Sequence, residues 1–215
     1  MSPFLFAIPL LGCTPVASVP VQALDAVRSG IPEVQAGDLI FQQSKSSQSE
    51  AIGLATGSRY THMGVLFRHQ GELVVFEAIQ PVSMTPLDRW TSRGVDGHYV
   101  VKRLANSEEV FTADVQAGML QVGKEFLGKP YDLQFGWDDE RLYCSELVFK
   151  VYERGADIQI GELSTLRSFD LSHPVVEQKL KERYGKQVPL DEPVISPQSM
   201  FESPNLVLVV DYPGD

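Results

Sequence analysis

The sequence predicts a fold of the α+β class, with an antiparallel sheet packed against helices. Three observations support this class. Short apolar runs of strand length cluster between residues 37 and 104, and two of them flank a glycine-containing turn. Two apolar segments with helical spacing follow between residues 115 and 153. Strands and helices do not alternate regularly, which argues against a parallel α/β sheet.

The strand predictions rest on apolar runs and alternating patterns bounded by turn-forming residues. His69-Gln70-Gly71 separates the second run from the third, which indicates a hairpin. Pro81 and Pro86 follow the hairpin and are expected to interrupt regular structure there. The predicted strands are Leu39–Gln42, His62–Phe67, Leu73–Ala78, Tyr99–Leu104 and Leu206–Val210.

Four helices are predicted from caps and from apolar residues that repeat every three or four positions. Ser47 and Glu50 form a capping-box pattern ahead of the first helix, and Gly57 is expected to end it. Asn106 is expected to cap the second helix, and Gly155 to follow the third. The Pro-rich stretch 188–204 is expected to be extended. The predicted helices are Gln48–Thr56, an apolar stripe from Val115 to Phe126, Cys144–Glu153, and Val175–Tyr184 after Pro174.

Length and composition limit the class of protein. The chain has 215 residues, which suits one domain, and a formal net charge of -10. This charge argues against a nucleic-acid surface, which requires clustered Lys and Arg. No apolar run reaches the roughly 18 residues that a membrane-spanning helix needs. The two cysteines, Cys13 and Cys144, exclude a scaffold framed by several disulfides.

The N-terminal segment predicts export. Phe4–Leu11 is an apolar block with the length of a signal-peptide core, although no Lys or Arg precedes it. Leu10-Leu11-Gly12-Cys13 resembles a bacterial lipoprotein box, in which the cysteine is lipidated. A periplasmic location, or a membrane tether through Cys13, is therefore expected. The alternative is an apolar N-terminal strand or tail on a cytoplasmic protein.

Metal and phosphate sites are not predicted. The chain has no Cys-x-x-Cys pair, and no two of its histidines are three or four residues apart. Gly123 to Lys129 fits the first seven positions of a phosphate loop, but Pro130 replaces the Ser or Thr that would bind Mg²⁺. The stretch is interpreted as the end of a helix. The four histidines are His62, His69, His98 and His173.

Cys144 is a candidate nucleophile because it begins an apolar helical run. At a helix N-terminus, the positive end of the helix dipole and the unpaired N–H groups favour a thiolate. The same N–H groups can bind an oxyanion. The alternative is a small buried helix residue without chemistry.

His62 and Glu77 are a candidate pair of a base and the acid that orients it. With a loop of His69-Gln70, the two residues lie directly opposite each other, on the same face of the hairpin. With a loop of Gln70-Gly71, they are diagonal neighbours on that face. A three-residue loop would separate them unless a bulge restored the alternation. A carboxylate beside the imidazole would fix its tautomer and stabilise its cation. The alternative is an edge-strand pair that faces water.

With these residues in place, the chain resembles the YiiX/YebB-type permuted papain-fold cysteine hydrolases, relatives of the NlpC-type cell-wall peptidases. The resemblance covers residues 37–153, with a looser match to Val210. It implies a circularly permuted papain-like fold, in which the Cys-bearing helix follows the strand that carries His. It also divides the chain into a signal segment and linker, 1–34, and a hydrolase domain, 35–212. The matching stretches are Gly37-Asp38-Leu39-Ile40-Phe41, Ser58–Val65, Val75–Ala78, Gly128–Asp132 and Tyr143–Val148.

The resemblance also implies roles for residues. Cys144 corresponds to the nucleophile, His62 to the base and Glu77 to the orienting acid. Tyr131, 13 residues before the cysteine, corresponds to a tyrosine of the oxyanion pocket. Tyr143 is expected to help bind substrate. In addition, Asp38 is expected to order a loop near the site, and the Ser-rich loop 44–49 and the insert 156–195 are expected to form walls of the substrate cleft.

The predicted function is hydrolysis of an amide bond through an acyl-enzyme on Cys144, without a cofactor. The implied substrates are a peptidoglycan stem peptide, a γ-glutamyl-type amide, or an amino-acid amide. Two alternatives remain open at this point. One is a lipid acyltransferase or thioesterase of the permuted superfamily, although Cys144-Ser145-Glu146 departs from the motif of those enzymes. The other is a binding module without catalysis. No sequence pattern indicates an oligomeric state.

Overall fold

A computed structural model of the protein describes residues 34–214. The block Phe4–Leu11 and the candidate lipidation site Cys13 lie outside the described residues. Export and the tether therefore stay predictions from the sequence, as does the division into a segment 1–34 and a domain 35–212. Within residues 34–214, none of the helices combines the length and apolar character that crossing a membrane requires.

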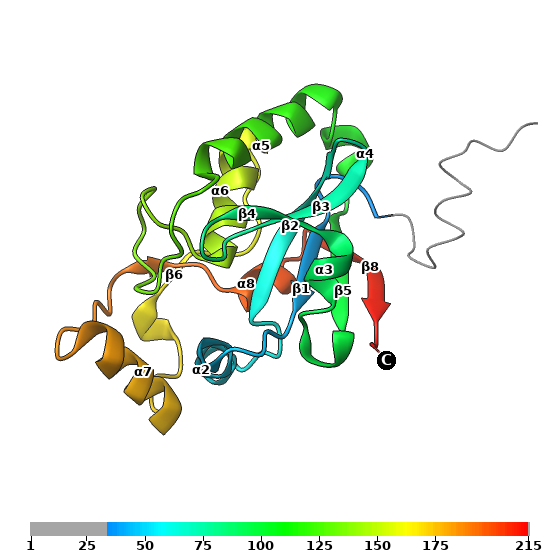
Figure 1. The fold of residues 1–215 in the computed structure, drawn as a ribbon. Helices are drawn as coiled ribbons and strands as arrows, with labels where there is room; N and C mark the ends of the chain where they lie inside the picture. Colours follow the sequence, from blue (N-terminus) through cyan, green and yellow to red (C-terminus); the bar gives the residue numbers. More distant parts are fainter. Residues whose placement is uncertain (1–33, 215) are drawn as a thin grey trace, which may run out of the picture. The chain divides into compact units, whose positions relative to one another are not determined.

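Six antiparallel strands form the central sheet, in the order β4-β3-β2-β1-β5-β8 (Figure 1). All five predicted strands lie in this sheet, the first and fourth with the predicted ends and the other three with small changes at theirs, and β4 was not predicted. A separate two-stranded pair joins β6, Ser164–Thr165, to β7, Pro193–Val194. The six strands are β1 Leu39–Gln42, β2 His62–His69, β3 Glu72–Glu77, β4 Ser83–Pro86, β5 Tyr99–Leu104 and β8 Leu206–Tyr212.

The turn between β2 and β3 sets the register of the hairpin. Gln70 and Gly71 form a two-residue loop with φ angles of 53° and 88°. Positive φ at both positions is typical of a type I′ turn, which matches the twist of the flanking strands. Val65 then lies opposite Phe76. This register makes His62 and Glu77 diagonal neighbours, the second of the arrangements considered from the sequence.

The helices pack mainly beside the sheet. α5 and α6 lie side by side, and α6 contacts β2 (Figure 1). α7 lies beside α2, away from α5. The helices are α2 Ser47–Thr56, α3 Leu87–Thr91, α4 Ser107–Val110, α5 Ala113–Phe126, α6 Cys144–Ala156, α7 Pro174–Tyr184 and α8 Pro197–Phe201, with 3₁₀ turns at Val95–Gly97 and Leu166–Ser168.

Several predicted helix ends differ from those in the structure. The cap of α2 is Ser46, whose hydroxyl accepts from the Ser49 N–H, so the cap lies one residue before the predicted Ser47. The helix expected after Asn106 is split into α4 and α5, because Thr112 caps a new start. The stretch 188–204, expected to be extended, contains β7 and α8.

The predicted end of α6 is wrong. Gly155 lies inside the helix, which continues to Ala156 and ends at Asp157 in the left-handed region. The glycine is required by packing between helices rather than by a helix end. A Cβ atom at Gly155 would lie 2.7 Å from the backbone N of Met119 on α5. This close approach lets α5 and α6 pack with their backbones in contact.

The core lies between the sheet and α6. Leu147, Val148 and Val151 are fully buried on the helix, and they pack in one cluster with Phe41 and Met63 from the sheet. Because Cys144 belongs to the first turn of this buried helix, its position relative to β2 is fixed by the core.

Gly155→Ala is predicted to destabilise the protein. Replacing glycine by alanine inside a helix normally stabilises it by about 1 kcal/mol. Here the methyl group would overlap the α5 backbone, and overpacking of this kind costs about 1–3 kcal/mol. Urea unfolding of both proteins should therefore show a lower free energy of unfolding for the variant.

Glu125→Ala is a matched control on the facing helix, because Glu125 is exposed on α5. Its free energy of unfolding should stay within about 0.5 kcal/mol of the wild type. A Gly155→Ala protein as stable as the wild type would show that the helix packing is looser than described.

Candidate active site

Cys144 is the first residue of α6, directly after Tyr143 at the N-cap. The Tyr143 N–H donates to Glu146 Oε2 at 3.3 Å, which fixes the start of the helix. N–H groups of a first helical turn have no partners inside the helix, so they are available to an anion. Cys144 is 2% exposed, and it lines an apolar cavity.

His62 lies at the start of β2, between Cys144 and Glu77. Its Nε2 atom is 2.6 Å from Glu77 Oε2. Cys144 acts on the same ring through hydrogen bonding and charge, and Nδ1 is the nitrogen that remains for it. The indole of Trp90 stacks on the imidazole, with ring centroids 5.9 Å apart. The structure thus brings together the three residues that the sequence proposed as nucleophile, base and orienting acid.

The electrostatics of this group favour a cationic imidazole. Burial lowers the pKa of His62, but its interactions with Cys144 and Glu77 outweigh burial and raise the pKa to about 9. Burial raises the pKa of Glu77, but the hydrogen bond and charge of His62 outweigh it and lower that pKa. An imidazolium beside Cys144 is the state that stabilises a thiolate.

Glu77 is wholly buried, and three further side chains donate to it. Thr85 Oγ1 donates to Oε1 at 2.5 Å, Trp90 Nε1 to Oε2 at 3.0 Å, and Arg93 Nη2 to Oε1 at 2.5 Å. Sequence reasoning missed all three. The segment from β4 to the end of α3 has no apolar periodicity, and only the rarity of tryptophan in the chain marks Trp90.

Tyr131 lies near Cys144 with its hydroxyl in a defined orientation. Gln48 Nε2 donates to Tyr131 Oη at 2.9 Å, so the phenol can donate its own proton elsewhere. Burial raises the pKa of Tyr131, and the nearby Cys144 adds to the effect. The phenol therefore stays neutral. The Tyr131 backbone is held as well, because its N–H donates to Gln80 Oε1 at 2.7 Å.

Tyr143 and Asp38 are held in place by hydrogen bonds to other segments of the fold. Tyr143 Oη accepts from the Ile195 N–H at 3.1 Å, and the ring lines the apolar cavity beside Cys144. Asp38 is buried, accepts from the Gln35 N–H, and pairs with Arg103 Nε at 2.7 Å. These contacts agree with an ordering role for Asp38.

Two cavities adjoin the candidate residues. The apolar cavity, of about 80 Å³, includes Cys144, and the polar cavity, of about 250 Å³, includes His62. Ile52 lines both. The insert 156–195 supplies walls of the apolar cavity, and residues 44–49 supply walls of the polar one. The stretch 44–49 was expected to be a loop, but its residues 47–49 belong to α2. The apolar cavity is lined by Ala51, Ile52, Ala55, Thr56, Phe135, Tyr143, Cys144, Ser145, Leu166, Phe169, Leu171, Val176, Lys179, Leu180, Arg183, Val194, Ile195, Ser196 and Pro197. The polar cavity is lined by Gln42, Ser44, Ser46, Gln48, Ser49, Ile52, Thr61, His62, Ala78, Ile79, Gln80, Arg93 and Tyr131.

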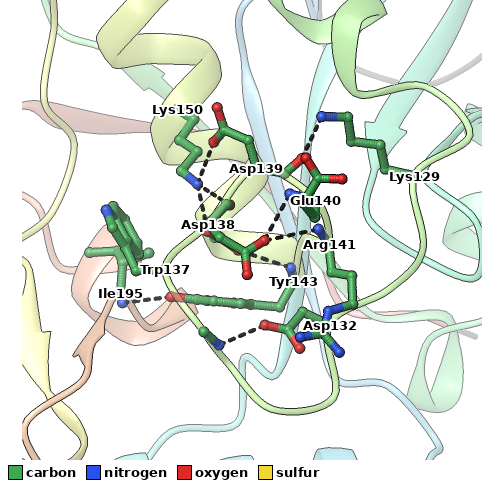
Figure 2. A network of polar contacts seen from close by, with 12 residues as sticks. Lys129, Asp132, Trp137, Asp138, Asp139, Glu140, Arg141, Tyr143, Lys150 and Ile195 are labelled. Carbon is green, nitrogen blue, oxygen red and sulfur yellow. Dashed lines mark hydrogen bonds and ion pairs between the residues drawn. The ribbon is translucent and has the colours of Figure 1, made fainter.

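A polar network fastens the loop that carries Tyr131 to α6. The buried Lys150 Nζ donates to Glu146 Oε1 at 2.7 Å, Asp139 Oδ1 at 2.9 Å and the Asp138 carbonyl at 2.5 Å. Figure 2 shows Lys150 directed at Asp139 and Asp138, and Lys129 at the Asp139 backbone from the other side. Burial raises the pKa of Glu146 to about 8, although Lys150 opposes the effect. The loop is thus tied to the helix that begins with Cys144.

Comparisons with known proteins found a matching family model and similar proteins. A family model described as "permuted papain-like amidase enzyme, YaeF/YiiX, C92 family" matches residues 33–210. The uncharacterized protein YiiX of Escherichia coli K12 is 49% identical over 175 residues, covering 81% of this chain and 85% of YiiX. A solved structure, described as metalloprotein yiiX from Escherichia coli O157:H7, superposes with a TM-score of 0.79. It is 49% identical and covers 83% of this chain and 97% of that one.

His62 is predicted to stay protonated at neutral pH and to lose its proton near pH 9. The Cys144→Ala substitution removes one of the two groups that raise the pKa of His62, while burial continues to lower it. The titration midpoint should therefore fall by more than one unit. NMR titration of labelled histidine rings measures both midpoints, and His62→Gln assigns the signal.

Glu125→Ala, an exposed change on α5, is the matched control and should leave the His62 midpoint unchanged. A His62 midpoint near 6.5 in the wild type, unchanged in the Cys144→Ala variant, would contradict the coupling between the two residues.

Lys150→Met is predicted to cost about 1–3 kcal/mol at pH 7, because it removes the common donor of Glu146, Asp139 and the Asp138 carbonyl. Since the pKa of Glu146 is raised to about 8, its carboxyl group is mostly protonated at this pH. Glu146→Gln, which keeps an acceptor for the Tyr143 N–H and for Lys150, should therefore lower the free energy of unfolding much less in urea unfolding. A Glu146→Gln protein as unstable as Lys150→Met would show that a negative charge on Glu146 is needed.

Proposed function

The chain belongs to the permuted papain-like amidase family, and on that premise we propose that it hydrolyses an amide bond through an acyl-enzyme on Cys144. The observation that supports this most is the position of His62, which contacts the buried Glu77 and interacts with Cys144. A base that interacts with the nucleophile on one side and with an orienting acid on the other is the arrangement that covalent catalysis requires.

The steps follow from the positions of these groups. His62 Nδ1 holds the proton of the Cys144 thiol, and Sγ attacks the amide carbonyl. The Cys144 N–H and the Tyr131 O–H bind the oxyanion that forms. As the C–N bond breaks, the imidazolium gives its proton to the leaving amine. Water then attacks the thioester, with His62 accepting its proton, and the carboxylic acid and the free thiol are released.

The proposed substrates are the three classes expected from the sequence. A peptidoglycan stem peptide, a γ-glutamyl-type amide and an amino-acid amide all contain the bond that this mechanism cleaves. Envelope-linked substrates fit the predicted export of the chain.

A second candidate is an acyltransferase or thioesterase that acts on lipid acyl groups. The apolar cavity favours it, because Cys144 opens into a space walled by residues such as Leu166, Leu180 and Val194. An acyl chain bound there would place its carbonyl carbon at the thiol. The chemistry on Cys144 is the same for both candidates, and the acceptor of the acyl group differs.

The solved relative is described as a metalloprotein, so the donor set of this chain bears on the mechanism. In the part of the chain that the structure describes, no three or more His, Cys, Asp or Glu side chains group closely enough to hold a metal ion. Structural and catalytic metal sites generally need at least three such ligands. The described residues do not fit a metal site, and no step above uses one.

Cys144→Ala tests the proposal. The variant should lose at least about 1,000-fold in turnover, since the covalent step is removed. Its free energy of unfolding should stay within about 1 kcal/mol of the wild type. Mass spectrometry of fragments released from purified peptidoglycan measures the amide activity, and acyl transfer from phospholipid vesicles measures the alternative.

Iodoacetamide labelling provides the matched control. In a Cys13→Ala background, Cys144 is the remaining cysteine. It should be alkylated at neutral pH, and His62→Gln should slow the reaction. An unreactive Cys144 whose loss only lowers stability would overturn the proposal and favour a binding module.

A further inference from the structure

We propose that the polar cavity beside His62 binds the leaving amine, and that Arg93 selects amines that carry a carboxylate. The preferred substrates would then be N-acyl amino acids, or peptides cut before a C-terminal amino acid. This inference rests on the proposed amide hydrolysis. It adds a substrate class and a residue that determines specificity.

The positions of the two cavities assign the two halves of the substrate. Cys144 opens into the apolar cavity and His62 into the polar one, with Ile52 between them. The carbonyl side of the substrate must reach the thiol. The leaving nitrogen must reach the imidazole, because His62 protonates it. The group attached to that nitrogen therefore enters the polar cavity.

The charge of the polar cavity favours an anion. Its walls consist mainly of hydroxyl and amide side chains, including Gln48, Thr61 and Gln80. Arg93 and the imidazolium of His62 supply two positive charges, and the Glu77 carboxylate that both contact offsets one of them. No carboxylate lines the cavity within residues 34–214, since Glu77 is buried below the surface. An anionic group is thus attracted into the cavity, although the whole chain has a net charge of -10.

Arg93 is placed to bind that anion. Its Nη2 donates to Glu77 Oε1, which holds the guanidinium in position. The side chain is 41% exposed and lines the cavity. A guanidinium has five N–H donors in a planar fork, so donors remain for a carboxylate after the contact with Glu77.

A second observation indicates that the cavity is a binding site. Gln42 lines it, is 2% exposed, and its Oε1 atom has no hydrogen-bond partner among the described residues. A buried carbonyl oxygen without a donor is costly, and such an acceptor marks a place where an N–H or O–H group of a ligand, or water, completes the hydrogen bonding. Gln42 lies next to Gly94, which directly follows Arg93.

The experiment compares two substrates that differ only in the carboxylate: N-octanoylalanine and N-octanoylalaninamide. The wild type should cleave the acid with a kcat/KM about 10-fold or more above that of the amide, as expected for one charged hydrogen bond. Arg93→Gln should bring this ratio close to one, mainly by raising KM for the acid. Arg93→Lys should retain part of the preference.

The ratio of the two kcat/KM values distinguishes direct binding of the carboxylate by Arg93 from an indirect effect of Arg93 through Glu77. If Arg93 only supports Glu77, Arg93→Gln lowers the activity on both substrates equally and the ratio persists, which overturns the inference. Equal rates on both substrates in the wild type also overturn it. Arg89→Gln is the matched control, because Arg89 is exposed on α3 four residues earlier. It should leave rates and ratio unchanged.

If neither substrate is cleaved, that result counts against the proposed function for these amides. A binding measurement then still tests the inference about Arg93. Calorimetry with the Cys144→Ala protein should then show that N-octanoylalanine binds more tightly than its amide. The difference should disappear when Arg93→Gln is added. Equal binding of the two compounds, or no binding of either, would overturn the inference.

Discussion

The buried carboxylate of Glu77 is the constraint on which the rest of the site depends. A charged group without access to water is tolerated only with donors around it, and Glu77 has four: His62, Thr85, Trp90 and Arg93. These donors come from β2, β4, α3 and the residues just after α3. The contacts that hold this edge of the sheet together are therefore the same contacts that orient the candidate base.

The features that the sequence could predict are those set by neighbouring residues. The β2–β3 hairpin follows from two apolar runs and a turn containing Gly71, and strand alternation on either side of a two-residue loop places His62 and Glu77 on one face. The start of α6 at Cys144 follows from the apolar stripe behind it. The family match confirmed the permuted papain-like class. The sequence could predict this class because several short motifs in a fixed order are specific, whereas a single motif would not be.

The features that the sequence could not predict depend on contacts between distant segments. Trp90 and Arg93 lie in a stretch without periodicity, and their partner Glu77 is at least 13 residues away. Gly155 was interpreted as a helix end, because the sequence gives no sign of the α5 backbone packed against it. Apolar side chains of the insert could be recognised in the sequence, but the cavity they form with α2 exists only after folding.

The reacting groups could be predicted better than the cavity walls because the two lie on different parts of the fold. The reacting groups lie on β2, β3 and α6, whose positions are determined by the core. Most of the cavity walls lie on residues 44–46, on α2, on the residues after α3 and on the insert 156–195, which contribute less to the core. Such segments can change in sequence without disturbing Cys144 or His62. Arg93 belongs to both groups, because its Nη2 atom donates to Glu77 while the exposed part of its side chain lines the cavity. A change at this position would therefore alter substrate preference and the orientation of the base together, which limits how far the polar cavity can diverge while the candidate triad is kept.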